Sequence, residues 1–160
     1  MAPKTRRLPM FYKLFFLVIE PISALAGAYM AYFQPAKYLT LTTPLSPSPS
    51  ELPLSTSIVL VQLANLYLLF AINEGLVLRS TSDMTVWKTV LFGLLVADLG
   101  HLYSVRALGF GGYYRFWEWN VMAWGNVGFV YAGALMRICF LSKVGLGHGK
   151  DSKAALSKSK

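Results

Sequence analysis

The chain has little of what soluble or metal-binding proteins normally use. Only 14% of its residues are charged, whereas a soluble domain is about a quarter charged. Its one cysteine, Cys139, excludes an internal disulfide, and it has no Cys/His cluster with the spacing of a metal site. It also lacks a glycine-rich phosphate loop, a Walker pattern and a Gly-x-Ser-x-Gly elbow. We therefore expect no metal, no cofactor, and no nucleotide-binding or serine-hydrolase function.

Long apolar runs take the place of those features. The chain is 55% hydrophobic, with a mean hydropathy of +0.48. Four apolar stretches are each about 20 residues long, the length that crosses a bilayer core of about 30 Å as a helix. They cover residues 12–33, 58–77, 86–105 and 121–142. The sequence predicts an all-α, polytopic membrane four-helix bundle.

The distribution of positive charge predicts the orientation of these helices. The net charge is +8, and twelve of the fifteen Lys and Arg residues precede span one, flank the 79–85 connection, or lie in or beyond the last helical turns. The remaining three are Lys37, Arg106 and Arg115. Because basic residues gather on the cytosolic side, we expect both termini in the cytosol. The expected membrane is the endoplasmic reticulum, and the charge indicates lipid headgroups rather than nucleic acid as partners.

The chain divides into three predicted parts. Residues 1–10 form a basic cytosolic arm, residues 11–144 the membrane domain, and residues 145–160 a disordered basic tail. The longest loop, residues 34–57, contains five prolines and is expected to be extended or polyproline-like rather than helical. The first apolar run is too long for a signal peptide and is interpreted as a retained helix.

Polar residues inside the spans are the candidates for function, since an intramembrane charge is costly. Asp98 and His101 lie three residues apart on one helix face, where a carboxylate can orient an imidazole as an acid/base unit. Glu20 precedes Pro21, whose ring locally opens the helix, so that its carboxyl can serve as a general acid. Each of these also has a structural alternative, as a buried pair that fixes packing.

Other polar and aromatic residues extend the candidate site. Glu74 is a further candidate acid, although a Glu74–Arg137 pair is the ordinary way to neutralise two buried charges. Arg137 could also hold a substrate oxygen. The remaining candidate substrate-binding residues are amides and tryptophans, of which the tryptophans could stabilise a cation: Asn65, Trp119, Asn120, Trp124 and Asn126.

Three segments resemble those of a known group of proteins: Phe-Phe-Leu-Val-Ile-Glu-Pro at 15–21, Asn73-Glu74, and Ala-Asp-Leu-Gly-His at 97–101. They are similar to small fungal four-helix membrane proteins, some encoded in secondary-metabolite clusters. More distantly, the chain resembles the emopamil-binding sterol isomerase superfamily, the membrane-bound terpene cyclases of fungi, and the small hydrolases that open polyketide epoxides. These resemblances imply carboxylic acids at Glu20, Glu74 and Asp98 in an aromatic cavity.

Together these observations predict a cofactor-independent acid/base enzyme acting on a hydrophobic natural product or lipid, by epoxide opening or isomerisation. Asp98 and His101 would form the base, and Glu20 or Glu74 the acid. The alternative is a non-enzymatic lipid-binding or membrane-assembly protein. A third and less favoured hypothesis is a proton-coupled carrier, because four helices form a small path unless the chain forms a homo-oligomer. An enzyme needs its acids to converge on one cavity, whereas a scaffold needs each acid paired with no space left.

Overall fold

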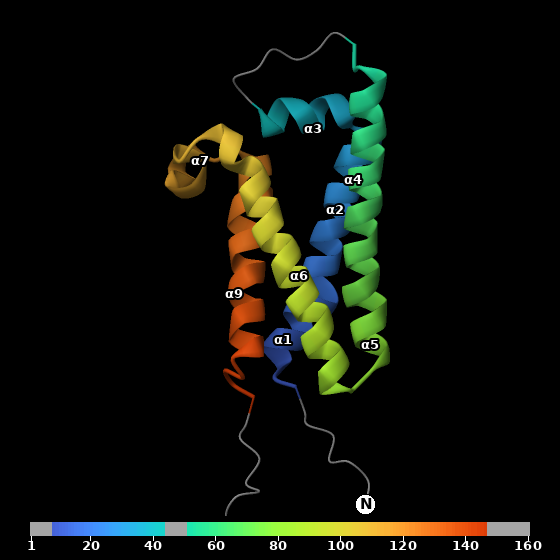
Figure 1. Ribbon diagram of the computed structural model, residues 1–160, viewed down its shortest axis with the longest axis vertical. Coiled ribbons are helices and arrows are strands. Elements are labelled where there is room, and N and C mark those ends of the chain that lie inside the picture. The colour runs from blue at the N-terminus through green and yellow to red at the C-terminus, as the bar shows by residue number, and fades with distance from the viewer. Residues whose placement is uncertain (1–7, 44–50, 147–160) are drawn as a thin grey trace, which may run out of the picture.

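Four long helices form the body of the protein in the computed structural model, which describes residues 8–43 and 51–146 (Figure 1). The spans cover Met10–Phe33, Leu54–Ser80, Met84–Leu108 and Val121–Leu141, each long and apolar enough to cross a membrane. No strand occurs in the described residues. The all-α four-helix prediction is confirmed, and by length and composition the chain is a multi-pass membrane protein.

Three of the four spans combine α-helix with a π-helical segment. Span one comprises α1 (Met10–Leu14), the π segment η1 (Phe15–Ile19) and α2 (Glu20–Phe33). Span two comprises α4 (Leu54–Ile72), the π segment η2 (Asn73–Val77) and α5 (Leu78–Ser80). Span three is α6 (Met84–Ser104) followed by the 3₁₀ turn η3 (Val105–Leu108). Span four comprises α8 (Val121–Ala123), the π segment η5 (Trp124–Phe129) and α9 (Val130–Leu141).

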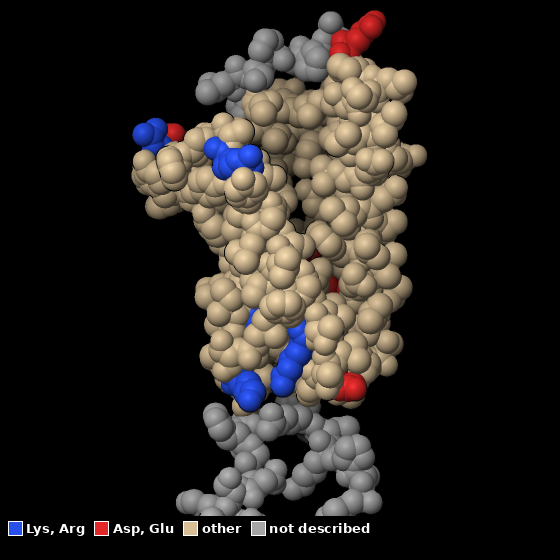
Figure 2. All heavy atoms as spheres, in the orientation of Figure 1, with Lys and Arg blue, Asp and Glu red and all other residues tan. Residues whose placement is uncertain are grey.

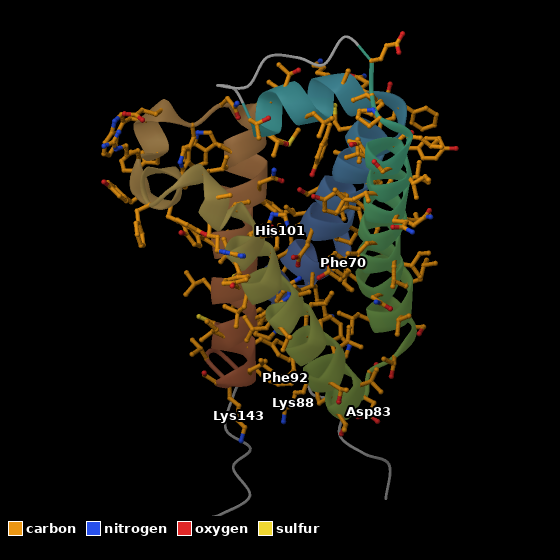
Figure 3. The ribbon with its side chains drawn as sticks, turned by 45° about the horizontal axis from the view of Figure 1, so that its top comes forward. Phe70, Asp83, Lys88, Phe92, His101 and Lys143 are labelled. Carbon is orange, nitrogen blue, oxygen red and sulfur yellow. The ribbon has the colours of Figure 1, made fainter. Side chains whose placement is uncertain are left out.

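The spans alternate in direction, so the described ends of the chain lie at one end of the bundle (Figure 1). The tight connection before α6 lies at this end, where the Asp83 side chain accepts a hydrogen bond from the Thr85 N–H at 2.7 Å. Lys88 and Lys143 lie there as well (Figure 3). Termini on one side agree with the predicted orientation. Of the predicted 145–160 tail only Gly145 and Leu146 are described, and Leu146 is buried in the core rather than free in solution. Residues 147–160 and most of the 1–10 arm fall outside the described residues.

One prediction about the long loop was wrong. Residues Pro35–Thr42 form the helix α3, which lies across the end of the bundle opposite the termini (Figure 1). Proline is tolerated in the first helical turn, where its missing N–H has no partner to lose, so Pro35 begins this helix rather than preventing it. The far end also carries α7 (Gly111–Tyr114) and the 3₁₀ turn η4 (Phe116–Glu118), with exposed aromatic side chains typical of a membrane interface.

Two separate apolar clusters hold the bundle together. At the end near the termini, all four spans contribute to one core, which includes Tyr12, Phe16, Trp87, Leu91 and Phe140. At the far end a smaller core of Ala31, Tyr38, Leu60 and Ala64 attaches α3 to α2 and α4. Between these levels α2 packs along α4, and α6 packs along α9. The bundle is thus two helix pairs, joined near the termini and bridged by α3 at the other end.

The outer surface of the spans is suited to lipid. On the face shown in Figure 2 the middle of the molecule exposes almost entirely uncharged residues, and charged side chains gather near the two ends. Exposed apolar side chains along the spans include Ile22, Leu69 and Leu99. The same view shows acidic atoms deep between the two helix pairs. These spans therefore bury charge inside and expose apolar surface outside.

Pro21 leaves a backbone carbonyl without its helical partner, and another span supplies one. A proline has no N–H, so it cannot bond the carbonyl four residues earlier, that of Leu17. Arg79, at the end of span two, donates from Nη2 to the Leu17 oxygen at 2.7 Å. An unpaired carbonyl in a bilayer would cost several kcal/mol. Arg79 thus supplies a hydrogen-bond donor for the Leu17 carbonyl that Pro21 leaves without its helical partner.

We expect Arg79→Met to lower stability by about 1 kcal/mol, because the Leu17 carbonyl loses a charged donor. In a Pro21→Ala background the loss should be smaller, since the new N–H at position 21 can bond that carbonyl. Thermal unfolding in detergent measures both, with Lys88→Met as the control for an exposed cation at the same end. An equal loss in both backgrounds would contradict this account.

Candidate functional site

One guanidinium lies at the centre of the bundle and contacts a carboxyl from each of the other three spans. Arg137 of α9 donates from Nη2 to Glu20 Oε1 at 2.5 Å and to Glu74 Oε1 at 2.9 Å. Its Nη1 donates to Asp98 Oδ2 at 2.6 Å. The predicted Glu74–Arg137 pair is therefore present, and it is one of three. We call Glu20, Glu74, Asp98 and Arg137 the Arg137 cluster.

The cluster is buried and holds more acids than bases. Arg137 is 2% exposed and Glu74 fully buried, and the side chains of Glu20 and Asp98 are 12% and 14% exposed. If every carboxyl were ionised, three negative charges would face one positive charge. Glu20 Oε1 and Glu74 Oε1 accept from the same nitrogen, Nη2 of Arg137, so the two carboxyls are close neighbours. Neighbouring carboxylates repel unless one carries a proton, so we expect a cluster that is stable inside a bilayer to retain at least one proton.

Glycine at position 133 makes room for this cluster. A Cβ at Gly133 would lie 2.7 Å from Arg137 Nη1 and 3.1 Å from Glu20 Oε1. Both distances are shorter than ordinary van der Waals contact, so any larger residue would displace the ion pair. Below the guanidinium, the ring of Phe16 lies 5.9 Å from Arg137 Cζ, within the range of a cation–π contact.

The π-helical segments occur at the level of the site. Glu20 follows η1 directly, Glu74 lies within η2, and Asn126 lies within η5. A π segment adds a residue to a helical turn and shifts the face that the following side chains occupy. Such segments occur often at functional sites. Here they turn polar side chains of three spans toward the bundle interior.

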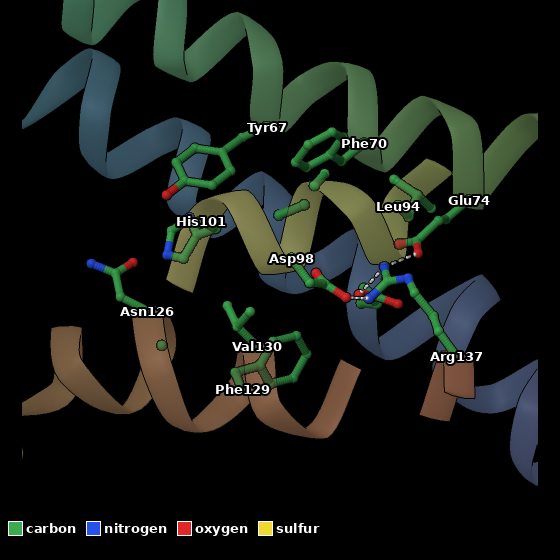
Figure 4. Close-up of a pocket in the computed structure, with 14 residues that line it drawn as sticks. Tyr67, Phe70, Glu74, Leu94, Asp98, His101, Asn126, Phe129, Val130 and Arg137 are labelled. Atoms are coloured by element: carbon green, nitrogen blue, oxygen red, sulfur yellow. Dashed lines mark hydrogen bonds and ion pairs between the residues drawn. The ribbon is translucent and has the colours of Figure 1, made fainter. Parts of the chain in front are cut away.

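A cavity of about 90 Å³ lies next to the cluster, on the side toward α3 (Figure 4). All four members of the cluster line it, which confirms the prediction that Glu20 and Asp98 share a cavity. Aromatic rings form much of its wall: Tyr67, Phe70 and Phe129. Figure 4 shows Arg137 and Glu74 at one end of the cavity and His101 with Asn126 at the other. The volume is several times that of the space a water molecule needs.

Several buried polar atoms of the residues that line the cavity have no protein partner in the described part of the chain. They are His101 Nε2, Arg137 Nε and the Oε2 atoms of Glu20 and Glu74. Asp98 is bound by Arg137 through Oδ2. The His101 ring interacts with the backbone of Asn126, and Asp98 pairs with Arg137 rather than with His101. Both predicted residues therefore face the cavity, but as separate polar groups rather than as a hydrogen-bonded unit.

Four of the predicted substrate-binding residues lie away from this cavity. Asn65 is on the exposed face of α4. Asn120 caps α8 by accepting from the Ala123 N–H at 2.8 Å, and its amide donates to the Leu41 carbonyl at 2.9 Å. Trp119 lines a separate pocket beside Asn120, and Trp124 is half exposed. Only Asn126 and Arg137 of that set line the central cavity.

Sequence reasoning missed several residues that shape the cavity. Tyr67, Phe70 and Phe129 stood among many aromatics, and nothing in the sequence separates those that face inward. Gly133 and Gly125 are visible as small residues, but their roles depend on helix rotation. The described residues contain no group of His, Cys, Asp and Glu suited to hold a metal ion. The three carboxyls of the cluster are instead bound to Arg137.

Comparison with known proteins identifies one family. The family described as "Domain of unknown function (DUF7704)" matches residues 5–147, which is most of the chain. No curated protein and no solved structure matches this chain. The resemblances to fungal membrane proteins, sterol isomerases and terpene cyclases therefore stay predictions.

We expect Gly133→Ala to destabilise the protein by about 1–3 kcal/mol, because its Cβ overpacks the Arg137–Glu20 pair. The matched control is Gly100→Ala in α6, where a Cβ meets nothing within 4 Å. That change should be neutral or stabilise by up to about 1 kcal/mol, as for a helical glycine replaced by alanine. Thermal unfolding in detergent compares the two. A Gly133→Ala midpoint at or above that of Gly100→Ala would refute the steric argument.

Removing the guanidinium should be more costly than removing all four charges. Arg137→Met leaves three buried carboxyls without a cation, and breaking a buried pair costs about 3–5 kcal/mol. Adding Glu20→Gln, Glu74→Gln and Asp98→Asn to the Arg137→Met variant should restore much of the lost stability, because no buried charge then remains without a partner. Size-exclusion chromatography of detergent extracts measures the folded fraction of each variant. Arg137→Met behaving like wild type would contradict a cluster held by charge.

Proposed function

We propose that this chain, which belongs to the family described as Domain of unknown function (DUF7704), is a membrane-embedded acid/base enzyme. Its proposed substrate is a hydrophobic natural product or lipid, and its reaction is the opening of an epoxide or an isomerisation. The proposed membrane is the endoplasmic reticulum. One observation carries the proposal: the cluster of three carboxyls on one guanidinium forms the wall of an aromatic cavity inside the bilayer.

The exposure of the three acids divides their roles. Glu74 has a side chain only 1% exposed and serves to hold Arg137. Glu20 and Asp98 are the more exposed acids of the cavity wall, and Glu20 Oε2 has no hydrogen-bond partner within the described chain. Because the cluster retains a proton, one of these two carboxyls can be a neutral acid while the other is an ionised base. Such pairs with opposite protonation states are how enzymes run acid and base chemistry together.

In epoxide opening, the neutral carboxyl would donate its proton to the epoxide oxygen as the C–O bond breaks. A water molecule, or a hydroxyl of the substrate, would form the new C–O bond and give its proton to the carboxylate. In isomerisation, the acid would protonate one carbon of a double bond and the base would remove a proton from another. Either reaction leaves the proton count of the site unchanged, with the two carboxyls exchanged. Before the next turnover the proton returns from one carboxyl to the other, and water in the cavity can carry it.

The walls of the cavity suit a cationic or polarised intermediate. The faces of Tyr67, Phe70 and Phe129 can stabilise positive charge developing on carbon. His101 and Asn126, at the opposite end from Arg137, can hydrogen-bond a polar group of the substrate. A scaffold protein would have no use for unpaired polar atoms beside an open cavity. The three acids line an open cavity in addition to binding Arg137, and this favours an enzyme over an assembly protein.

Asp98→Asn should abolish the activity, although the amide oxygen of the new side chain can still accept a hydrogen bond from Arg137. Loss of general acid/base catalysis costs about 10²–10⁴-fold in rate. Untargeted metabolite profiling of the native host, with protein amounts matched by immunoblot, should show the same apolar precursor accumulating in Asp98→Asn and in a deletion. Glu118→Gln, an exposed carboxyl outside the site, is the control and should match wild type. A wild-type metabolite profile for Asp98→Asn would overturn the proposal.

A further inference from the structure

A second pocket opens sideways toward the bilayer, between α2 and the start of span four. Its volume is about 220 Å³. One wall is the small-residue face of α2, with Ser23, Ala26 and Gly27, and the other is formed by Met122 and Gly125. Tyr38 of α3 closes its far end, and its hydroxyl lies 3.2 Å from that of Tyr67. We call this space the lateral pocket.

The lateral pocket adjoins the central cavity. Tyr67, Gly125 and Asn126 line both spaces. Met30 lies ten residues beyond Glu20 on the same helix, about 15 Å along its axis. A chain running from the Arg137 cluster to Met30 would therefore pass through the central cavity and fill the lateral pocket.

The rim of the lateral pocket faces lipid rather than protein. Ala26 and Gly125 are exposed, and Val121 beside them is 77% exposed. A Cβ at Gly125 would meet nothing within 4 Å, so the space in front of it is open. The two helix pairs are bridged above this opening by α3, through the Asn120–Leu41 hydrogen bond at 2.9 Å. A molecule dissolved in the bilayer can enter here without crossing a polar surface.

The charge of the inner end restricts what can bind there. The lining of the central cavity contains one cation, Arg137, and three carboxyls already bound to it. An anionic headgroup would meet surplus negative charge in a medium of low dielectric constant, which costs several kcal/mol. An uncharged polar end avoids this cost, and a hydroxyl group can donate to His101 Nε2, which lacks a partner in the described chain.

We propose that the two spaces form one binding site for an elongated apolar molecule with an uncharged oxygen-bearing end, which enters from the bilayer between α2 and η5. The inference rests on the proposed function, because it places the reacting oxygen beside Asp98 and Glu20. The apolar chain lies in the lateral pocket, and the polar end reaches the Arg137 cluster. The substrate class is therefore uncharged long-chain alcohols, epoxides and carbonyl compounds, and excludes fatty acids and lipid phosphates.

Photolabelling of the full-length protein in phosphatidylcholine vesicles tests this site without requiring turnover. The probe is a long-chain alcohol carrying a mid-chain diazirine and a terminal alkyne, and the comparator is the carboxylic acid with the same chain. Labelled peptides should contain Met30 or Met122, and the acid should label at least about tenfold less, since tenfold corresponds to only about 1.4 kcal/mol. Excess unlabelled alcohol should compete.

Variants that fill the lateral pocket provide the decisive comparison. Gly125→Leu places a side chain in the open space at the rim of the lateral pocket and should reduce labelling about tenfold, the effect of about 1.4 kcal/mol of lost binding. The matched control, Gly100→Leu, adds the same side chain to an exposed and equally open position on α6 and should label like wild type. Ala26→Phe fills the pocket from α2 and serves if Gly125→Leu does not fold.

Three results would overturn the inference: undiminished labelling in both filling variants, labels confined to α4 and α6, or equal labelling by the acid. Asp98→Asn should still bind the probe. If Asp98→Asn leaves the metabolites unchanged while labelling still depends on Gly125, the enzyme proposal fails and the binding site stands. If Asp98→Asn blocks turnover while labelling is unchanged in Gly125→Leu, the enzyme proposal stands and the proposed role of the lateral pocket is wrong.

Discussion

The buried guanidinium of Arg137 is the interaction on which the rest of the structure depends. An isolated charge in a bilayer is expensive, and Arg137 lies in span four with almost no exposure. Glu20, Glu74 and Asp98 supply its partners from spans one, two and three. One side chain thereby fixes the relative depth and rotation of all four helices. The proline opening near Glu20, the π segments and Gly133 are local adjustments that let these carboxyls reach it.

This arrangement also explains why the bundle has space on one side of the cluster. Toward the termini the four spans share an aromatic core around Phe16 and Phe140. Toward α3 the bridging helix and its small core join the two helix pairs. Polar groups at mid-depth cannot be covered by apolar side chains from a partner span without losing their own partners. The helices therefore separate where the cluster ends, and the central cavity and the lateral pocket lie in the space between the two helix pairs.

The sequence predicted those features that depend on one helix at a time. Twenty-residue apolar runs predicted the four spans, and the cost of intramembrane charge predicted that Glu74 would pair with Arg137 and that Glu20 and Asp98 would face the interior. The same rule does not extend to Asn65, because an uncharged amide on a lipid-facing surface is far less costly than a charge. Trp119 and Trp124 lie near the membrane interface, where tryptophans concentrate for reasons unrelated to a site. The cavity walls could not be predicted, because Tyr67 and Phe129 face inward only as a result of helix rotations set by contacts between spans.

The number of acids distinguishes a packing device from a reactive site. A single carboxylate neutralises a guanidinium, and it does so with the smallest desolvation cost. The Arg137 cluster has three carboxyls, and the two additional ones make neutrality depend on bound protons. A cluster kept only for packing would gain more from apolar side chains at two of these positions, since well-packed apolar residues often match or exceed a buried ion pair in stability. The surplus of acids therefore favours proton transfer over packing as the role that we propose for the cluster. In that proposal Glu20 and Asp98, the more exposed of the three acids that line the cavity, move the protons.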